Sequence, residues 1–452
     1  MSDAATVLFE KQRKLRESHG MTVAFLAESM TDVQSLIDGD SDNFTVEIKP
    51  GTYNPTETLK LINKDHVHIK ANGVNIEYGG TASNGIQNHP IIDMTGSRRC
   101  TIEGLRVDWN PGDTHRPSCA LLLARNETAA SSHQNSFMNC VFQGYFTKAA
   151  VLMVCAESDV FFRCEITNYA NVSSGAYALW ITSDTPSGVG ATGTLGLSSM
   201  LTAWFYDCTF TRWRAIPTGG DRSWVMASED AAIYIESNSS GTGDIHFIGG
   251  QMSGPSPDTG NAADNVNDSS KLMKAMLKLN AVGTGRIGRV SVEGVRVECG
   301  AAKAVWWVQG DDHTTSYVSG IRTRANYMQS AERLFVSENN VTVEDLDIDE
   351  SEFYSLTSCN WAYDKTDGTT LDIVASDRTR AVVDVGYIQD SYIKLGARLV
   401  WTTHGDTSSP TSDFRCWTTV RARAAATRCR FRAQQTGDVG GVATSGQKEV
   451  FS

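Results

Sequence analysis

Short runs in which apolar and polar residues alternate, each interrupted by one small residue, recur along most of this chain. The clearest run is Cys100–Asp108. Further copies are Val160–Ile166, Trp204–Phe210, Ile245–Met252, Val290–Val297 and Val341–Ile348. An alternation that stops at a small residue and then resumes predicts a strand, a sharp bend and a second strand.

The predicted bends recur at intervals that share one basic length. The small residues are Gly104, Cys140, Cys164, Cys208, Gly249, Gly294, Gly320 and Asp345. Their spacing ranges from 24 residues (Cys140 to Cys164) to 45 residues (Gly249 to Gly294), so the longer intervals contain one unit and a loop insertion. Imperfect repeats of about 25 residues indicate the stacked coils of a solenoid.

A second family of short strands falls between most copies of the first. Its members are apolar at their first and third positions: Ile92–Thr95, Leu121–Ala124, Leu152–Cys155, Leu179–Thr182, Ile233–Glu236, Leu277–Asn280, Trp306–Gln309, Leu334–Ser337 and Val383–Gly386. Each coil would therefore contain three short strands. We expect about eleven coils, stacked at about 4.8 Å per strand.

The two ends of the chain differ from this pattern. Residues 1–38 have helical spacing at Ala4–Ser18 and Met21–Ile37, which predicts either a helical lid on the first coil or an attachment segment. Residues 39–400 are predicted to be the solenoid. In residues 401–452 the pattern fades, and we expect a small β-rich cap and a trimer-locking tail that cover open strand edges.

Composition excludes several classes of protein. A net charge of −12 argues against nucleic acid as a partner, because phosphate binding needs a basic surface. No apolar run is long enough for membrane insertion, and the N-terminal residues do not have the basic-then-apolar pattern of a signal peptide, which predicts synthesis in the cytoplasm. The 10 cysteines form no CxxC pair, and we expect no metal and no cofactor. The bend cysteines should be small buried side chains.

The turn Lys49-Pro-Gly-Thr-Tyr53, the repeated bends and the column of cysteines resemble a right-handed parallel β-helix of the pectin-lyase type. The fold class is thus all-β. A short N-terminal segment, acidic charge and a distinct C-terminal end make the arrangement similar to bacteriophage tailspikes. That resemblance implies a homotrimer in the virion tail, made in the host cytoplasm. Residues 1–38 would bind a phage tail or adaptor protein.

The same resemblance implies recognition of a bacterial surface polysaccharide, either lipopolysaccharide O-antigen or capsule. Whether the chain also cleaves the polymer, as an endo-glycosidase would, stays open at this point. Two alternatives remain. One is a cellular β-helix polysaccharide hydrolase or lyase, and the other is a structural or adhesive virion fibre without catalysis.

Stacking the second strand family places its second positions in one outward column. That column is Asp93, Leu122, Met153, Trp180, Tyr234, Lys278, Trp307, Phe335 and Asp384. Large apolar residues on an outer face usually mark a contact. Aromatic rings there could stack on sugars. We favour a homotrimer interface, because leucine and methionine pack well but bind sugar rings poorly. The predicted interface residues are Leu122, Met153, Trp180, Tyr234, Trp307 and Phe335.

The longest insertions lie between Thr182 and Met276, where a binding site is expected. Predicted carbohydrate-binding residues are Trp204, Trp213, Trp224, Arg222 and Asp207. Glycosidic hydrolysis uses two carboxyl groups, and the candidates are Glu229, Asp230 and Glu236. The stretch Glu229-Asp-Ala-Ala-Ile233 is similar to the Asp-Asp-x-x-Ile of polygalacturonase-like hydrolases. Alternatively these acids are solvated strand ends, and Asp207 belongs to a solvated acidic face. The turn Asp311-Asp-His313 is a second candidate site.

Overall fold

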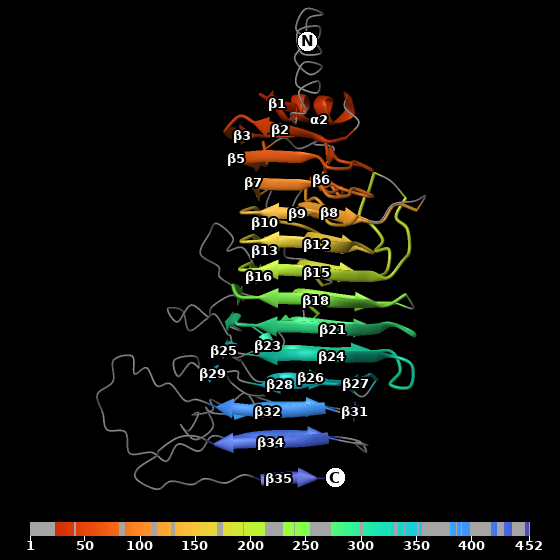
Figure 1. Cartoon of the computed structure of the whole chain (residues 1–452), viewed down its shortest axis with the longest axis vertical. Helices are drawn as coiled ribbons and strands as arrows, with labels where there is room; N and C mark the ends of the chain where they lie inside the picture. Colours follow the sequence, from red (N-terminus) through yellow and green to blue (C-terminus); the bar gives the residue numbers. More distant parts are fainter. Residues whose placement is uncertain are drawn as a thin grey trace, which may run out of the picture.

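Three short strands and the turns between them form one coil, and each strand pairs in parallel with its counterpart in the next coil (Figure 1). The computed structural model describes residues 23–354 with internal gaps, the longest at 213–228 and 254–272. Beyond residue 354 it describes only strands between residues 380 and 451. The predicted parallel β-helix is confirmed.

One wall of the stack, here named sheet B, is an 11-stranded sheet built from the second strand family. In spatial order its strands are β4 (Leu59–Lys60), β6 (Ile92–Asp93), β8 (Leu121–Ala124), β11 (Ala149–Val154), β14 (Tyr177–Thr182), β17 (Ala231–Ser237), β20 (Met273–Ala281), β23 (Ala302–Gly310), β26 (Arg333–Ser337), β30 (Arg380–Val385) and β33 (Trp417–Ala422). The eleven strands match the expected number of coils.

The remaining strands form sheet A, whose first part stacks from the N-terminal end. It contains β1 (Val23–Ala27), β2 (Phe44–Ile48), β5 (His68–Glu77), β7 (Thr101–Trp109), β9 (Ser136–Met138), β12 (Glu157–Phe162), β15 (Met200–Tyr206), β18 (Thr242–Ile248), β21 (Arg286–Glu293), β24 (Tyr317–Arg324), β27 (Thr342–Glu344) and β31 (Tyr387–Gln389). Every neighbouring pair in this series is parallel.

The second part of sheet A follows the bend in each coil. Its strands are β3 (Gly51–Tyr53), β10 (Val141–Gly144), β13 (Glu165–Asn168), β16 (Thr209–Arg212), β19 (Gln251–Ser253), β22 (Arg296–Glu298), β25 (Tyr327–Gln329) and β29 (Glu352–Tyr354). At the C-terminal end β28 (Asp347–Asp349), β32 (Ser391–Ala397) and β34 (Cys429–Gln435) continue the stack, and β35 (Lys448–Phe451) pairs antiparallel with β34.

The solenoid extends beyond both of the boundaries predicted for it, residues 39 and 400. The segment expected to be a helix at Met21–Ile37 instead contains strand β1, which pairs with β2, followed by helix α2 (Met30–Gly39). Ser29 caps this helix, because its hydroxyl accepts the backbone N–H of Asp32 at 3.0 Å. Beyond residue 400, β33 and β34 still stack in parallel on the preceding coil. Residues 1–22 lie outside the described residues.

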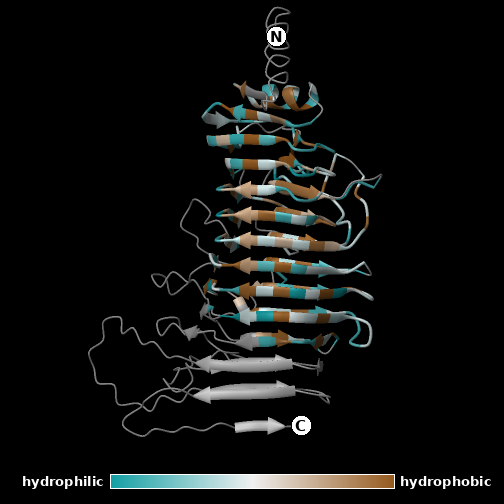
Figure 2. Ribbon diagram, viewed as in Figure 1, coloured by the Kyte–Doolittle hydropathy of each residue, from teal (hydrophilic) through white to brown (hydrophobic). Residues whose placement is uncertain are grey.

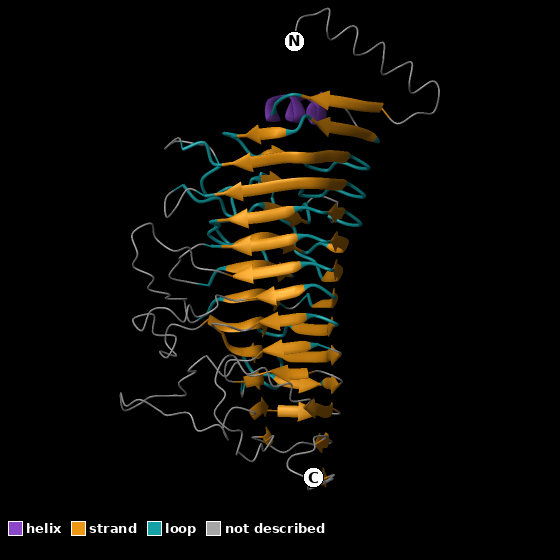
Figure 3. Cartoon of the chain, turned by 90° about the vertical axis from the view of Figure 1, so that its left-hand side faces the viewer, coloured by secondary structure: helices purple, strands orange, loops and turns teal. Residues whose placement is uncertain are grey.

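Helix α2 lies across the N-terminal end of the stack (Figure 3). Val33, Leu36 and Ile37 point from it into the core. This one helix covers the N-terminal end of the core, while the helical segment predicted for residues 1–38 as a whole stays a prediction. Helix α2 covers apolar side chains of the first coils that would otherwise face water.

Stacked phenylalanines form the centre of the core. Phe137, Phe161, Phe205 and Phe247 occupy the same register position in β9, β12, β15 and β18, and their ring centroids are 4.6, 4.9 and 5.0 Å apart. These separations match the spacing between paired strands. Brown and teal alternate along the strands because successive side chains face the core and the solvent in turn (Figure 2).

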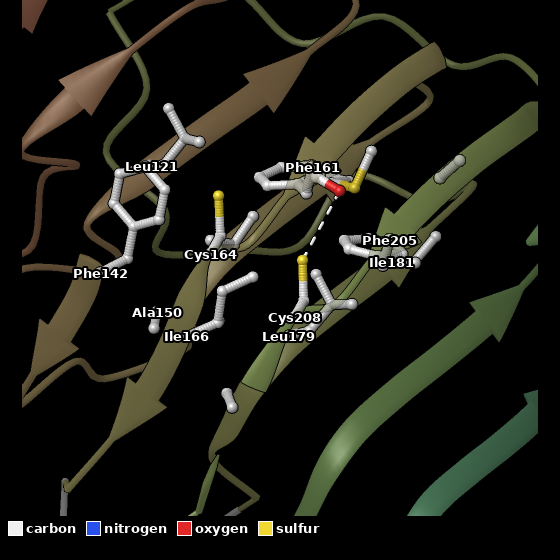
Figure 4. Close-up of a cluster of buried hydrophobic side chains, with 14 of the residues drawn as sticks. Leu121, Phe142, Ala150, Phe161, Cys164, Ile166, Leu179, Ile181, Phe205 and Cys208 are labelled. Atoms are coloured by element: carbon white, nitrogen blue, oxygen red, sulfur yellow. Dashed lines mark hydrogen bonds between the residues drawn. The ribbon is translucent and has the colours of Figure 1, made fainter. Parts of the chain in front are cut away.

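The predicted column of small buried cysteines is also confirmed. Cys140, Cys164 and Cys208 are free thiols that are at most 2% exposed. Each thiol contacts a backbone carbonyl of the preceding coil, as Cys208 does with Phe161 (Figure 4). Burial raises the pKa of Cys164 to about 12, which disfavours the reactive thiolate form.

In the three coils that contain these cysteines, the bend falls at the residue before each cysteine, one position earlier than predicted. Asn139, Arg163 and Asp207 have φ values of 53°, 52° and 51°, and Gly249 follows in the next coil at 68°. Asparagine, aspartate and glycine adopt this left-handed conformation at low cost. Asp207 is therefore explained by the backbone of the corner as well as by its charge.

The predicted outward column was wrong at two coils. Leu122 pairs with Leu152 and not with Met153, and Trp307 pairs with Val336 and not with Phe335. Met153 and Phe335 point into the core and are fully buried. A shift of one residue moves a side chain to the opposite face of a strand. The true column is Lys60, Asp93, Leu122, Leu152, Trp180, Tyr234, Lys278, Trp307 and Val336.

The apolar part of this column is covered by the chain itself. Residues 183–199, here named the strap, leave β14 and return over the outer face of sheet B (yellow-green loop, Figure 1). Val189 of the strap packs on Leu122 and Leu152, which are both 0% exposed. Leu122, Met153 and Phe335 are therefore not interface residues. The homotrimer itself stays a prediction.

Polar contacts hold the strap in place. The Asp93 carboxylate accepts the backbone N–H of Thr192 at 2.8 Å, and the carbonyl of Thr194 accepts the N–H of Glu127 at 3.0 Å. His89 Nδ1 lies 2.6 Å from the carbonyl of Gly190. The strap thus closes the outer face of β6, β8 and β11, and the outer face of sheet B beyond β14 is where side chains remain available.

Candidate functional site

The outer face of β14, β17, β20 and β23 carries aromatic and ionisable side chains in neighbouring rows. One row across these strands is Trp180, Tyr234, Lys278 and Trp307, and the next is Thr182, Glu236, Asn280 and Gln309. Because the parallel strands pair in register, these residues lie side by side on neighbouring strands. Trp180 and Trp307 are half-buried, so part of each indole ring faces solvent.

Two lysines and two glutamates form a network at one side of this face. Lys278 Nζ is 2.6 Å from Glu229 Oε2, and Lys274 Nζ is 3.3 Å from the same oxygen. Lys274 also contacts Glu338 at 3.1 Å and Gln309 Oε1 at 2.7 Å. Lys274 Nζ lies 5.0 Å from the ring centroid of Trp307, and Lys278 Nζ lies 5.1 Å from that of Tyr234. Both distances are within the range of cation–π interactions.

The ion pairs of this network shift the pKa values of its members. Partial burial opposes ionisation of Glu229, but the hydrogen bonds and charges of Lys278 and Lys274 outweigh it and lower its pKa. Burial lowers the pKa of Lys278, and Glu229 counteracts this. Glu229 is consequently an ionised carboxylate whose oxygens are occupied by ammonium groups.

Glu236 lies in a different environment at the C-terminal end of β17. Burial raises its pKa, although hydrogen bonds from the hydroxyls of Tyr234 (2.9 Å) and Thr182 (3.2 Å) oppose that shift. Asn280 donates to the Tyr234 hydroxyl at 2.9 Å and orients it. A raised pKa extends the pH range in which a carboxyl group is protonated, as a general acid must be.

Asp184 is the second carboxyl group near Glu236. It lies two residues beyond Thr182, which pairs with Glu236 in the next coil. Its negative charge contributes to the raised pKa of Glu236, so the two groups interact electrostatically. The Asp184 carboxylate accepts the backbone N–H of Thr185 at 2.8 Å. Sequence reasoning missed Asp184, because only the pairing of coils brings its charge into range of Glu236.

Asp230 does not belong to this face. Its carboxylate is 2.7 Å from Arg212 Nη2, and both side chains are 1% exposed. The other carboxylate oxygen accepts the backbone N–H of Ala176 at 2.8 Å. The burial of Asp230 argues against the predicted catalytic role, and the ion pair anchors β17 to β16 and to the start of β14.

The predicted carbohydrate-binding residues do not gather in one place. Trp204 lies on the outer face of sheet A, where its ring stacks on His246 with centroids 6.2 Å apart. Asp207 lies at the corner after the same strand. Neither shares a wall of the stack with Glu229 or Glu236. Trp213, Trp224 and Arg222 lie outside the described residues, so their predicted role stays a prediction.

The second candidate site, Asp311-Asp-His313, is a turn stabilised by its own side chains. Asp312 Oδ1 accepts the backbone N–H and the hydroxyl of Thr314, each at 2.9 Å. Within the described ranges, no group of three or more His, Cys, Asp or Glu side chains is arranged to hold a metal ion. No helix in the described part of the chain is long and apolar enough to cross a membrane.

Comparisons with known proteins add little. No protein-family model and no curated protein sequence matches the chain. Among solved structures, a variant of the catalytic domain of the GH87 alpha-1,3-glucanase in complex with tetrasaccharides matches with a TM-score of 0.36 and 12% identity. The match covers 90% of this chain and 69% of the glucanase chain. Similarity at this level does not bear on the function of the chain.

Proposed function

We propose that the chain is a tailspike-like β-helix protein that binds a bacterial surface polysaccharide on the outer face of sheet B and hydrolyses its glycosidic bonds. One observation carries the proposal. Glu236, whose pKa is raised by burial, lies within electrostatic range of Asp184 and close to the half-buried indole of Trp180. Hydrolysis of a glycoside needs one protonated and one ionised carboxyl group at the scissile bond.

The roles follow from the two environments. Glu236 would protonate the leaving glycosidic oxygen as the general acid, while Tyr234 and Thr182 hold its carboxyl group in position. Asp184 would act as the ionised partner, either as a base that activates water or as a nucleophile. Trp180 packs edge-on to Tyr177 at 5.5 Å, and this contact keeps its ring in place as a platform for a sugar.

The tail-fibre part of this proposal has separate support. A long stack of coils with a helix-capped N-terminal end suits a rod that projects from a virion. Attachment to a phage tail or adaptor protein through residues 1–38, and assembly into a homotrimer, remain predictions. Multi-angle light scattering of the full chain tests the trimer, and a monomer mass of about 49 kDa would refute it.

Catalysis is tested by the release of reducing ends from purified surface polysaccharide. Glu236→Gln and Asp184→Asn should each reduce the rate by roughly 100-fold or more, the usual size of general acid–base contributions. Glu293→Gln is a matched control, because this exposed acid lies on sheet A, and its rate should equal that of the wild type. If all three variants cleave at the wild-type rate, the site assignment is wrong.

The pH profile provides a second readout. Glu236 must be protonated to act as an acid, so the rate should fall as pH rises through its raised pKa. Tyr234→Phe removes the hydrogen bond that stabilises the ionised form of Glu236, and this should raise the pKa further and move the fall to higher pH. An unchanged profile would remove Glu236 from the acid role.

A further inference from the structure

Lys274 and Lys278 are the cations of the candidate face whose side chains the structure describes, and both are already paired with carboxylates. The side chain of Lys278 is 4% exposed and that of Lys274 is 13% exposed. An ammonium group has three donors. Those of Lys274 have acceptors in Glu229, Glu338 and Gln309. Lys278 donates to the carboxylate and to the backbone carbonyl of Glu229 and lies over the ring of Tyr234.

Among the described ionisable side chains of this face, carboxyl groups outnumber ammonium groups. Lys274 and Lys278 supply two positive charges, and Glu229, Glu338, Glu236 and Asp184 supply four carboxyl groups. The sum is −2 when every group is ionised and −1 when Glu236 carries its proton. The whole chain has the same sign, with a formal net charge of −12. An anionic sugar would therefore meet repulsion both at the site and on approach.

Beside the paired carboxylates of Glu229 and Glu338, uncharged groups reach solvent on this face. Trp180, Trp307, Asn280 and Gln309 are half-buried, and each exposes part of an aromatic ring or an amide. Rings stack on the apolar faces of pyranoses, and amides both donate to and accept from hydroxyl or acetamido groups. These are the contacts that an uncharged sugar can satisfy fully.

On the basis of the proposed function, we propose that the site takes an uncharged polysaccharide and discriminates against polymers that carry uronic acid or other carboxylate sugars. The ion pairs of Glu229 and Glu338 would then be specificity-determining, because they neutralise the two lysines that could otherwise bind a carboxylate. The selectivity results from repulsion as well as from fit.

The test uses the full chain carrying Glu236→Gln, so that bound polymer is not degraded. Affinity electrophoresis compares an acidic surface polysaccharide before and after chemical reduction of its carboxyl groups, together with a panel of neutral surface polysaccharides. Reduced or neutral polymers should bind at least roughly 10-fold more tightly than the acidic form, equivalent to about 1.4 kcal/mol. Raising the salt concentration from about 50 to 500 mM should change the affinity for neutral polymer less than 2-fold, because no ionic contact is made.

A variant pair tests the mechanism of selectivity. In the same background, Glu338→Gln removes one partner of Lys274 and should increase affinity for the acidic polymer, while Glu344→Gln removes the same charge from sheet A and should not. The inference is overturned if the Glu236→Gln protein binds the acidic polymer more tightly than the neutral polymers, with an affinity that falls as salt rises. It is also overturned if Glu338→Gln and Glu344→Gln change the affinity for the acidic polymer equally. Binding of no polymer of either kind would instead refute the proposed function, and the inference with it.

Discussion

A buried acid far from the candidate site provides the sharpest stability test. Asp159 in β12 is 0% exposed. Its Oδ1 accepts the backbone N–H and the side-chain amide of Asn135 at 2.8 and 3.0 Å. Its Oδ2 has no hydrogen-bond partner among the described residues. Burial raises the pKa of this carboxyl group from 3.8 to about 7, because the ionised form has lost its water.

The raised pKa makes the folded state bind a proton more tightly than the unfolded state. Stability therefore falls as pH rises from about 4, where the unfolded chain releases this proton, to about 7, where the folded chain releases it too. Three pKa units correspond to about 4 kcal/mol. Asp159→Asn cannot ionise and resembles the protonated form. It should match the wild type near pH 4 and be up to about 4 kcal/mol more stable near pH 8.

The assay is guanidinium unfolding of both proteins at several pH values, followed by tryptophan fluorescence. The decisive quantity is the change with pH in the difference between the two unfolding free energies, because contributions from other acids cancel. A difference that is constant between about pH 4 and pH 8 would show that Asp159 is ionised throughout or is solvated. It would contradict the reasoning that its unpaired oxygen is buried without water.

Three further substitutions test the packing. Asp230→Asn leaves Arg212 buried without its counter-ion and should cost about 3–5 kcal/mol in the free energy of unfolding, measured by denaturant titration; a cost below about 1 kcal/mol would mean that the pair is solvated. Phe205→Ala opens a cavity between Phe161 and Phe247 and should cost about 3–5 kcal/mol, whereas Phe205→Leu should cost less than half of that. Leu152→Asp places a charge under the strap and should speed limited proteolysis within residues 183–199; unchanged cleavage would show that the strap does not depend on this contact.

The strand families were predictable because a strand of the wall must alternate between core and solvent. Every predicted member of the second family overlaps a strand of sheet B, and the bend cysteines lie in the core as expected. The errors were shifts of one residue in the register assigned to two of these strands. Val151 and Leu152, like Leu334 and Phe335, are both apolar, so the pattern cannot tell which of the two faces the core.

The sites were harder to predict because they depend on contacts across coils. Glu229 and Asp230 are neighbours in the chain, yet the first lies 49% exposed between two lysines and the second is buried against Arg212. Asp184 is 52 residues before Glu236 and carries no motif. Nothing local distinguishes these acids, since the pKa of each depends on burial and on charges supplied by other coils.

The sequence alone determined that this chain would coil into a stack of short parallel strands, because alternation and small bend residues are local features repeated from coil to coil. Only the tertiary structure decided which apolar residues are covered by the strap, which acid keeps a proton and which is locked in an ion pair. Those properties depend on register and burial, and a shift of a single residue between coils reverses them.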